Sequence, residues 1–227
     1  MNTSSSSITP GSTSTKIVVL GESGVGKSTF VATVCKKSGT YPESTVGAAV
    51  SMAWHEYRAG SVEQREELIE LWDIGGAAAH RPASTVFLDG ATGIILVHDL
   101  ANSKSECNLG QWLALVNGDR RMNTTHTMRS LMADVEASSV PILIVGTRLD
   151  QAPGRANAPP LTGAPRINMD CRKELVPGCS QAMTLSRFFD AVIDRARTGL
   201  GGGTSGGGGA SMGAGTAADP RRRRILM

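Results

Sequence analysis

The sequence predicts an α/β fold in which helices cover both faces of a mostly parallel, six-stranded sheet. Short continuous apolar runs, typical of strands buried on both sides, recur at residues 17–20, 93–97 and 141–145. Segments with helical periodicity alternate with these runs, and strands alternating with helices form parallel sheets. At 227 residues and 40% hydrophobic content, the chain is long enough for one domain of ordinary size with additional tails.

The first half of the chain predicts three strands and one helix. Residues 17–20 form a strand that ends at a glycine, and residues 27–37 form a helix that begins directly on the glycine-rich loop. Residues 50–57 and 68–72 alternate apolar and polar side chains and are joined through residues 58–61. This pattern predicts an antiparallel pair at one edge of the sheet.

The second half supplies three more strands and two helices. Residues 93–99 and 141–146 are continuous apolar strands, and residues 167–169 are a weak candidate for the sixth. Between them, residues 109–116 have a helical stripe made of Leu109, Trp112, Leu113 and Val116. A final helix over residues 185–193 places Leu185, Phe188, Phe189 and Ile193 on one side.

Four segments depart from this regular pattern, and the two at the ends of the chain set the domain limits at residues 15–199. Residues 1–14 are rich in Ser and Thr and are predicted to be disordered, and residues 200–227 form a glycine-rich linker with a basic tail. Residues 119–139 are polar and patternless, which predicts a long surface loop. Residues 151–165 contain four prolines in fifteen positions, which argues against a full helix there.

Composition excludes several classes of protein. The net charge is +3, and the run Arg221–Arg224 alone contributes more than this, so the folded part is close to neutral and no nucleic-acid partner is expected. Four scattered cysteines without a CxxC pair indicate reduced thiols in the cytoplasm. We find no signal peptide and no apolar run long enough for a membrane span.

Residues 21–28, with the sequence GESGVGKS, fit the phosphate-binding pattern GxxxxGK[ST] between a predicted strand and a predicted helix. The backbone N–H groups of such a loop wrap phosphates, assisted by the helix N-terminus. Lys27 would contact the β- and γ-phosphates, and the Ser28 hydroxyl would bind Mg²⁺. The alternative is a plain glycine turn with a surface lysine, but the strand-loop-helix context favours binding of a nucleoside triphosphate.

Two further motifs follow predicted strands. Asp73 ends a strand and is followed by Gly75 and Gly76, an arrangement that can hold magnesium through water and approach a γ-phosphate, although it also fits a simple turn. Asp150 follows the strand ending at Gly146, at the ligand edge of a parallel sheet. A carboxylate there can accept two hydrogen bonds from guanine, whereas adenine has no matching pair of donors. The alternative for Asp150 is an ordinary loop aspartate.

Together these motifs make the chain resemble a small GTPase of the Ras superfamily, within the Rab-like protein 3 group. The resemblance covers roughly residues 15–197. It depends on GESGVGKST (21–29), TVG (45–47), ELWDIGG (70–76), GIILVHDL (93–100), VGTRLDQ (145–151), INMDC (167–171) and LSRFFD (185–190). It implies a P-loop GTPase G domain that binds GTP or GDP with Mg²⁺.

The resemblance also implies a set of site residues. Nucleotide-binding residues would be Gly21, Ser23, Gly24, Val25, Gly26, Lys27, Ser28, Thr29, Thr45, Gly76, Thr147, Arg148, Asp150 and Cys171. Ser28, Thr45 and Asp73 (through water) would hold the metal, and Lys27, Thr45 and Gly76 would stabilise the γ-phosphate. Thr147 and Asp150 would read the base, with Arg148 in place of the usual lysine over it, and Cys171 would lie where a backbone N–H contacts the guanine oxygen.

Departures from the family pattern leave the function open between several readings. Ala77 stands where small GTPases place a glutamine that orients the attacking water, so hydrolysis should be slow. His80 could take the role of that glutamine only if this segment folds unusually. The readings are a GTP/GDP switch in trafficking or small-GTPase regulation, a GTP-stabilised scaffold that hardly cycles, and an ATP-using enzyme.

The resemblance further implies partners. Effectors and regulators would bind the switch regions, and the group suggests a homodimer. No cysteine follows Cys179, so no prenyl anchor is expected. The Arg221–Arg224 run allows at most weak contact with anionic membrane, with nuclear import and a solvated tail as alternatives.

Overall fold

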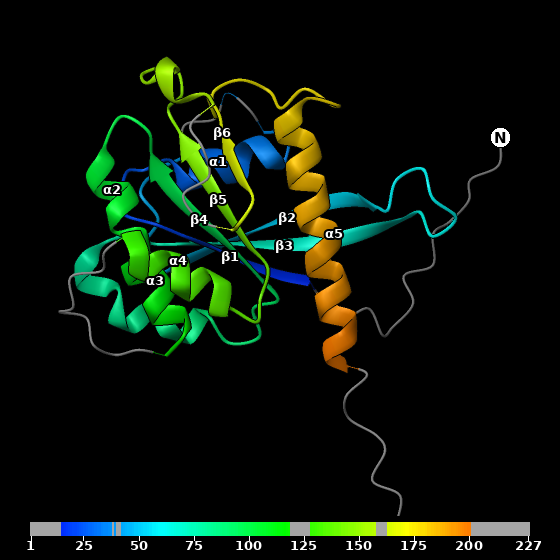
Figure 1. The fold of residues 1–227 in the computed structure, drawn as a ribbon, viewed down its shortest axis with the longest axis horizontal. Helices are drawn as coiled ribbons and strands as arrows, with labels where there is room; N and C mark the ends of the chain where they lie inside the picture. The colour runs from blue at the N-terminus through cyan, green and yellow to red at the C-terminus, as the bar shows by residue number, and fades with distance from the viewer. Residues whose placement is uncertain (1–14, 38, 40–41, 119–127, 158–162, 201–227) are drawn as a thin grey trace, which may run out of the picture.

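The computed structural model describes residues 15–37, 39, 42–118, 128–157 and 163–200, and these form one six-stranded sheet with helices on both faces (Figure 1). The strand order is β2-β3-β1-β4-β5-β6. Only β2 runs antiparallel to its neighbour β3; every other pairing is parallel. The strands are β1 (Thr15–Leu20), β2 (Ala48–Tyr57), β3 (Arg65–Ile74), β4 (Gly93–Asp99), β5 (Ile142–Thr147) and β6 (Arg166–Asn168). The predicted α/β class is therefore confirmed.

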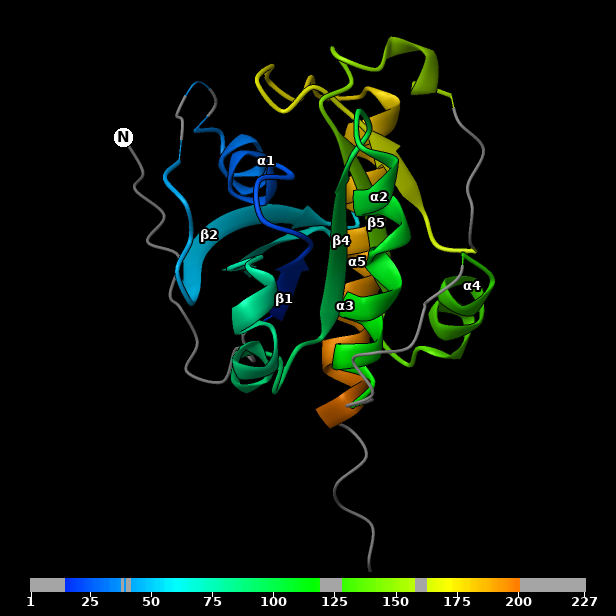
Figure 2. The same cartoon turned by 90° about the vertical axis from the view of Figure 1, so that its left-hand side faces the viewer.

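Five α-helices and three short 3₁₀ helices lie among the described residues. They are α1 (Lys27–Val34), α2 (Ser103–Cys107), α3 (Leu109–Val116), α4 (Met128–Ala137), α5 (Ser180–Leu200), η1 (Ala78–His80), η2 (Pro82–Phe87) and η3 (Pro153–Arg155). Figure 1 shows α3 and α5 on opposite sides of β4 and β5, and in Figure 2 α3 lies in front of α5. The predicted helices at residues 27–37, 109–116 and 185–193 are all present, and the last is longer than predicted.

The position of β1 between two cores explains why residues 17–20 form an unbroken apolar run. Ile17 and Val19 face a core shared with α1 and α5, which includes Phe30 and Phe188. Val18 and Leu20 belong to a second core on the other face, which contains Trp112 of α3. Because both faces are covered, residues 17–20 are all buried and all apolar.

The antiparallel pair β2–β3 is longer than predicted and is joined to α5 by polar contacts. Tyr57 donates a hydrogen bond to Asp194 Oδ1 at 2.5 Å, and His55 Nε2 lies 2.8 Å from Asp190 Oδ1. These contacts connect the end of the hairpin to the last helix. The predicted pairing at a sheet edge is correct, since β2 is the outermost strand on its side.

Part of the surface loop predicted for residues 119–139 is wrong, because residues 128–137 form helix α4. The physical reason is that one i, i+4 pair of apolar residues is enough to stabilise a short helix when a neighbouring helix provides an apolar surface for it to pack against. Leu131 is 2% exposed within the core that contains Trp112, and Val135 packs against the same core. The short helix α2 and the 3₁₀ turns were also not predicted.

The proline-rich segment 151–165 contains one 3₁₀ turn, η3, among its described residues. A buried ionic cluster holds this turn to the body. Glu106 of α2 is 3.0 Å from the Arg166 guanidinium and also pairs with Arg155, while Arg166 Nη2 lies 3.0 Å from His98 Nε2. Since an arginine only donates, His98 must accept here, and burial lowers the pKa of His98 from 6.5 to about 4. We call Glu106, Arg155, Arg166 and His98 the buried ionic cluster.

The expectations for residues 1–14, for the tail beyond residue 200 and for residues 119–127 and 158–162 lie outside the described part of the chain. In the part that the structure describes, no helix combines the length and apolar content needed to cross a membrane.

Candidate functional site

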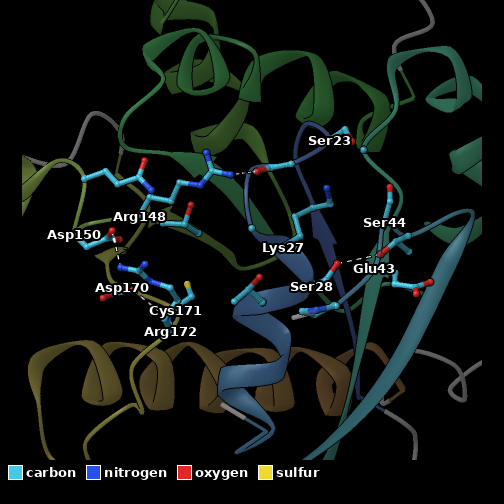
Figure 3. Close-up of a pocket in the computed structure, with 18 residues that line it drawn as sticks. Ser23, Lys27, Ser28, Glu43, Ser44, Arg148, Asp150, Asp170, Cys171 and Arg172 are labelled. Atoms are coloured by element: carbon cyan, nitrogen blue, oxygen red, sulfur yellow. Dashed lines mark hydrogen bonds and ion pairs between the residues drawn. The ribbon is translucent and has the colours of Figure 1, made fainter. Parts of the chain in front are cut away.

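The carboxyl ends of the parallel strands converge on one pocket of about 480 Å³ (Figure 3). This volume lies within the range of small-molecule sites. The segments after β1, β3, β5 and β6 all contribute, as does the stretch before β2. Of the predicted nucleotide-binding residues, the lining includes Ser23, Gly24, Gly26, Lys27, Ser28, Thr29, Thr45, Gly76, Thr147, Arg148, Asp150 and Cys171. The structure therefore brings together residues predicted from five separate motifs.

The phosphate-binding loop, residues 21–28, connects β1 to α1 in a conformation that needs glycine. Gly21 has φ +151°, and a Cβ there would lie 2.2 Å from the carbonyl oxygen of Val97 in β4. Gly26 has φ +93° and is the N-cap of α1. Gly21 and Val25 do not line the pocket; both are buried and support the loop from beneath.

Lys27 lies inside this loop and is 6% exposed. Its Nζ donates to the backbone oxygen of Glu22 at 2.8 Å, so the ammonium is held over the hollow of the loop. Burial lowers the pKa of Lys27, and the carboxylates of Asp73 and Glu22 oppose that shift. A phosphate group would supply the compensating negative charge that this buried cation has only in part.

Three oxygen-bearing side chains from different elements meet beside Lys27. Ser28 Oγ donates to Asp73 Oδ2 at 2.5 Å, Thr45 Oγ1 donates to the same oxygen at 2.8 Å, and the two hydroxyls are 3.0 Å apart. The second carboxylate oxygen, Asp73 Oδ1, is buried without a hydrogen-bond partner. Oxygen ligands with an unsatisfied buried carboxylate atom fit a hard divalent cation such as Mg²⁺.

The glycines after Asp73 bring the end of β3 against the other two segments. Gly75 N donates to the backbone oxygen of Gly47 at 2.8 Å, which ties the Thr45 segment to β3. Gly76 lies against the phosphate-binding loop so closely that a Cβ would be 2.4 Å from backbone atoms of Glu22 and Ser23. Its backbone therefore borders the place where a terminal phosphate would lie.

Residues 77–81 continue from Gly76 into η1 and lead to a buried arginine. Ala77 is half-buried and offers only a methyl group, and His80 is exposed at the end of η1. Arg81 is 8% exposed; its guanidinium carbon lies 4.6 Å from the centre of the Trp112 ring, and it also donates to Gln111. Cation–π contact with α3 thus fixes the segment that follows the glycines.

The opposite end of the pocket contains the residues predicted to read a base. Thr147 is 1% exposed, and its hydroxyl lies 2.6 Å from the backbone oxygen of Val25, so this side chain supports the phosphate-binding loop. Arg148 has φ +55° and joins β4 to the same loop, donating to Asp99 Oδ2 at 2.6 Å and to the Gly24 oxygen at 2.7 Å. Both residues hold the loop in place, a role that sequence reasoning did not assign to them.

Asp150 and Cys171 form the wall at this end. Asp150 Oδ2 is 2.7 Å from the guanidinium of Arg172, and the backbone oxygen of Cys171 accepts from Thr33 of α1 at 2.6 Å. Burial raises the pKa of the Cys171 thiol to about 12, and the carboxylates of Asp170 and Asp150 add to the rise. The thiol therefore stays protonated and serves as an apolar part of the wall.

Several lining residues were not predicted from sequence. They are Pro42, Glu43, Ser44, Gln151, Asp170 and Arg172. Each lies within three residues of a predicted site residue, so proximity in sequence was the available signal. Arg172 contacts the predicted base-reading residue Asp150 through its guanidinium.

Comparison with known proteins assigns this arrangement to a family. The model of the Roc family, described as "Ras of Complex, Roc, domain of DAPkinase", matches residues 16–150, more than half of the chain. Rab-like protein 3 of Xenopus tropicalis is 39% identical over 203 residues, covering 79% of this chain and 85% of the relative. This chain belongs to the Rab-like protein 3 group of small GTPases.

Other members of the group support the assignment. Rab-like protein 3 of Danio rerio is 38% identical over 199 residues, with 79% of this chain and 85% of the relative covered. The Homo sapiens protein is 38% identical over 200 residues, with coverage of 79% and 84%. The pocket of this Rab-like chain lies at the carboxyl edge of its parallel strands, where ligands bind in open α/β sheets and where the phosphate-binding loop leads into α1.

Proposed function

We propose that this Rab-like GTPase binds GTP and GDP together with Mg²⁺ in the 480 Å³ pocket. The observation that carries the proposal is that the two ends of one pocket carry different chemical groups. At one end lie Lys27 and the oxygens of Ser28, Thr45 and Asp73; at the other lies the carboxylate of Asp150. The first end suits phosphates and a divalent cation, and the second suits the N–H donors of guanine.

Each part of the nucleotide has residues that would hold it. The loop amides and Lys27 would bind the β- and γ-phosphates, and Ser28, Thr45 and Asp73 would hold Mg²⁺. When bound, the ion neutralises charge on the phosphate oxygens. Gly76 would meet the γ-phosphate through its backbone N–H, since no side chain fits there. Loss of the γ-phosphate would remove the contact that links Gly76 and Thr45 to the ligand.

We further propose that the protein acts as a GTP/GDP switch in the cytoplasm, in intracellular trafficking or in the regulation of other small GTPases. Effectors and regulators would bind the segments around Thr45 and residues 73–90, whose order depends on the γ-phosphate. Family resemblance supports a homodimer as part of this role. Intrinsic hydrolysis would be slow, because Ala77 has no polar group to orient the attacking water.

A second candidate is a scaffold that holds GTP and hardly cycles. Ala77 favours it, together with the neighbouring alanines 78 and 79, since none of these side chains can assist a water molecule. His80 is exposed at the end of η1, and the guanidinium of Arg81 contacts Trp112 and Gln111 instead of the phosphate end of the pocket. In this reading the nucleotide serves only to keep the binding surface ordered.

Mass spectrometry of the nucleotide that co-purifies with the full chain tests the binding proposal. We expect GDP or GTP at close to one molecule per protein, and ATP should not displace it. Displacement of bound GDP by ATP as readily as by GTP would overturn the assignment of Asp150 to a guanine base and favour an ATP-using enzyme.

Single-turnover hydrolysis of GTP, with and without cell extract, separates the switch from the scaffold. A slow intrinsic rate that extract accelerates supports the switch, and no hydrolysis in either case supports the scaffold. Ala77→Gln serves as the gain-of-function arm: if position 77 limits the rate, the variant should hydrolyse GTP about ten times faster or more. An unchanged rate would mean that another part of the site is limiting.

A further inference from the structure

Arg172 forms an ion pair with Asp150, the carboxylate that we propose binds the base. In Figure 3 its side chain extends from the segment after β6 toward Asp150, across the wall of the pocket. Arg172 Nη2 lies 2.7 Å from Asp150 Oδ2, a charge-assisted contact at hydrogen-bond distance. Arg172 is one of the residues that line the pocket, so its guanidinium lies beside the carboxylate that a guanine base would have to reach.

A second carboxylate keeps the arginine near this position. Arg172 Nε lies 3.1 Å from Asp170 Oδ1, and the same oxygen accepts the backbone N–H of Arg172 at 3.1 Å. These contacts depend on residue 170 and not on Asp150. If Asp150 turns to a ligand, Arg172 retains a charged partner and remains at the pocket wall.

Guanine needs both oxygens of the Asp150 carboxylate. Its ring N–H and exocyclic amine donate in parallel, one to each oxygen. Arg172 already donates to Oδ2, so a bound guanine must either displace this contact or share a weakened acceptor. Hypoxanthine, which lacks the exocyclic amine, needs one oxygen only and leaves Oδ2 to the arginine.

We propose that Arg172 is an internal competitor for the guanine-reading carboxylate and lowers both the affinity for guanine nucleotides and the discrimination against hypoxanthine nucleotides. The proposal rests on the proposed function, since it requires that Asp150 meets the base. Arg172 acts through Asp150 and is a specificity-determining residue outside the set that the family pattern implied. Its effect is limited, because the side chains of the pair are 56% and 23% exposed.

Equilibrium titration of the full chain with fluorescently labelled GDP and IDP tests the proposal. Compared with the unaltered protein, Arg172→Ala should bind GDP about two- to fivefold more tightly, the range expected for an exposed ion pair. Its affinity for IDP should be about the same as that of the unaltered protein. The ratio of the two dissociation constants should therefore rise. Arg172→Gln, which keeps much of the volume but not the charge, should behave like Arg172→Ala, and Arg172→Lys should bind GDP like the unaltered protein.

Lys173→Ala is the matched control, because Lys173 is the next residue, carries the same charge and lies 3.9 Å from Asp170 instead of Asp150. It should leave both dissociation constants unchanged. Asp150→Ala with and without Arg172→Ala completes a double-mutant cycle, in which removing the arginine should give no gain once Asp150 is absent.

The outcomes separate the two proposals. Failure of the unaltered protein to bind either nucleotide contradicts the proposed function itself. If the unaltered protein binds GDP and the variants Arg172→Ala and Arg172→Gln bind it equally or more weakly, the competitor role is wrong. Weaker binding by both variants would mean that Arg172 supports the site instead. A gain that is equal for GDP and IDP, or that persists without Asp150, also overturns the proposal.

Discussion

At the scale of single residues, Gly76 borders the terminal-phosphate end of the pocket and has no room for a side chain. Its missing Cβ would lie 2.4 Å from backbone atoms of Glu22 and Ser23, which no side-chain rotation relieves. Gly76→Ala should therefore lower the free energy of unfolding by about 1–3 kcal/mol, because the phosphate-binding loop must shift. It should also weaken binding of a non-hydrolysable GTP analogue more than binding of GDP. Chemical denaturation and nucleotide titration measure the two effects.

Gly154→Ala is the control for this substitution, since a Cβ at Gly154 meets open space. Gly154 also lies in a short 3₁₀ turn that tolerates alanine. The stability of the Gly154→Ala variant and its affinity for nucleotide should equal those of the unaltered protein. Equal behaviour of the two variants would show that the close approach of Gly76 to the loop is not essential.

At the scale of elements, the buried ionic cluster holds the segment between β5 and β6 to α2 and β4. Glu106 of α2 joins Arg155 of η3 to Arg166 of β6, and the side chains of Glu106 and Arg166 are 7% and 6% exposed. Glu106→Gln keeps the shape and removes the charge, which leaves the buried guanidinium of Arg166 without its compensating carboxylate. We expect a loss of about 3–5 kcal/mol in the free energy of unfolding. Urea denaturation checks it, and Glu136→Gln on the exposed face of α4 should change little.

Helix α4 depends on a small number of apolar contacts. Leu131 is 2% exposed and packs in the core that contains Trp112 of α3. Leu131→Ala should cost about 2–5 kcal/mol of stability through the cavity that it leaves. Glu136→Ala, on the same helix but exposed, is the comparison in urea denaturation. If both variants unfold at the same urea concentration, α4 does not contribute to the core as described.

At the scale of the whole molecule, His98 makes stability depend on pH in the acid range. It is fully buried in β4, and its pKa is about 4 in the folded protein against 6.5 for a free histidine. Between these values the unfolded chain binds a proton that the folded chain excludes. Stability should therefore fall as the pH drops from about 6.5 to about 4, and His98 should add no further slope above or below that window.

Thermal unfolding followed from pH 7.5 to pH 4.5 measures this dependence. His98→Asn should have a shallower slope in that interval, because no proton is taken up at position 98 on unfolding. The comparison is made within each variant, so an overall loss of stability in His98→Asn does not affect it. An identical slope in both proteins would assign the acid sensitivity to other groups.

The sequence predicted the sheet and most of the pocket well, because both depend on local patterns. Continuous apolar runs such as residues 93–97 identify buried strands directly, and the phosphate-binding loop has a spacing that its ligand dictates. Helix α4 was not predicted, since its stability comes from packing against α3 and not from its own composition. The contact of Arg172 with Asp150 joins residues that follow different strands, and no periodicity encodes it.

The protected thiol of Cys171 has a practical consequence for following this protein in solution. With a pKa of about 12 and 5% exposure, it will react very slowly with maleimides at neutral pH even though it borders the pocket. Cys107, at the end of α2, is exposed and free. A fluorophore attached under mild conditions should therefore go first to Cys107, which places an optical reporter on the molecule without altering the residues that would hold a nucleotide.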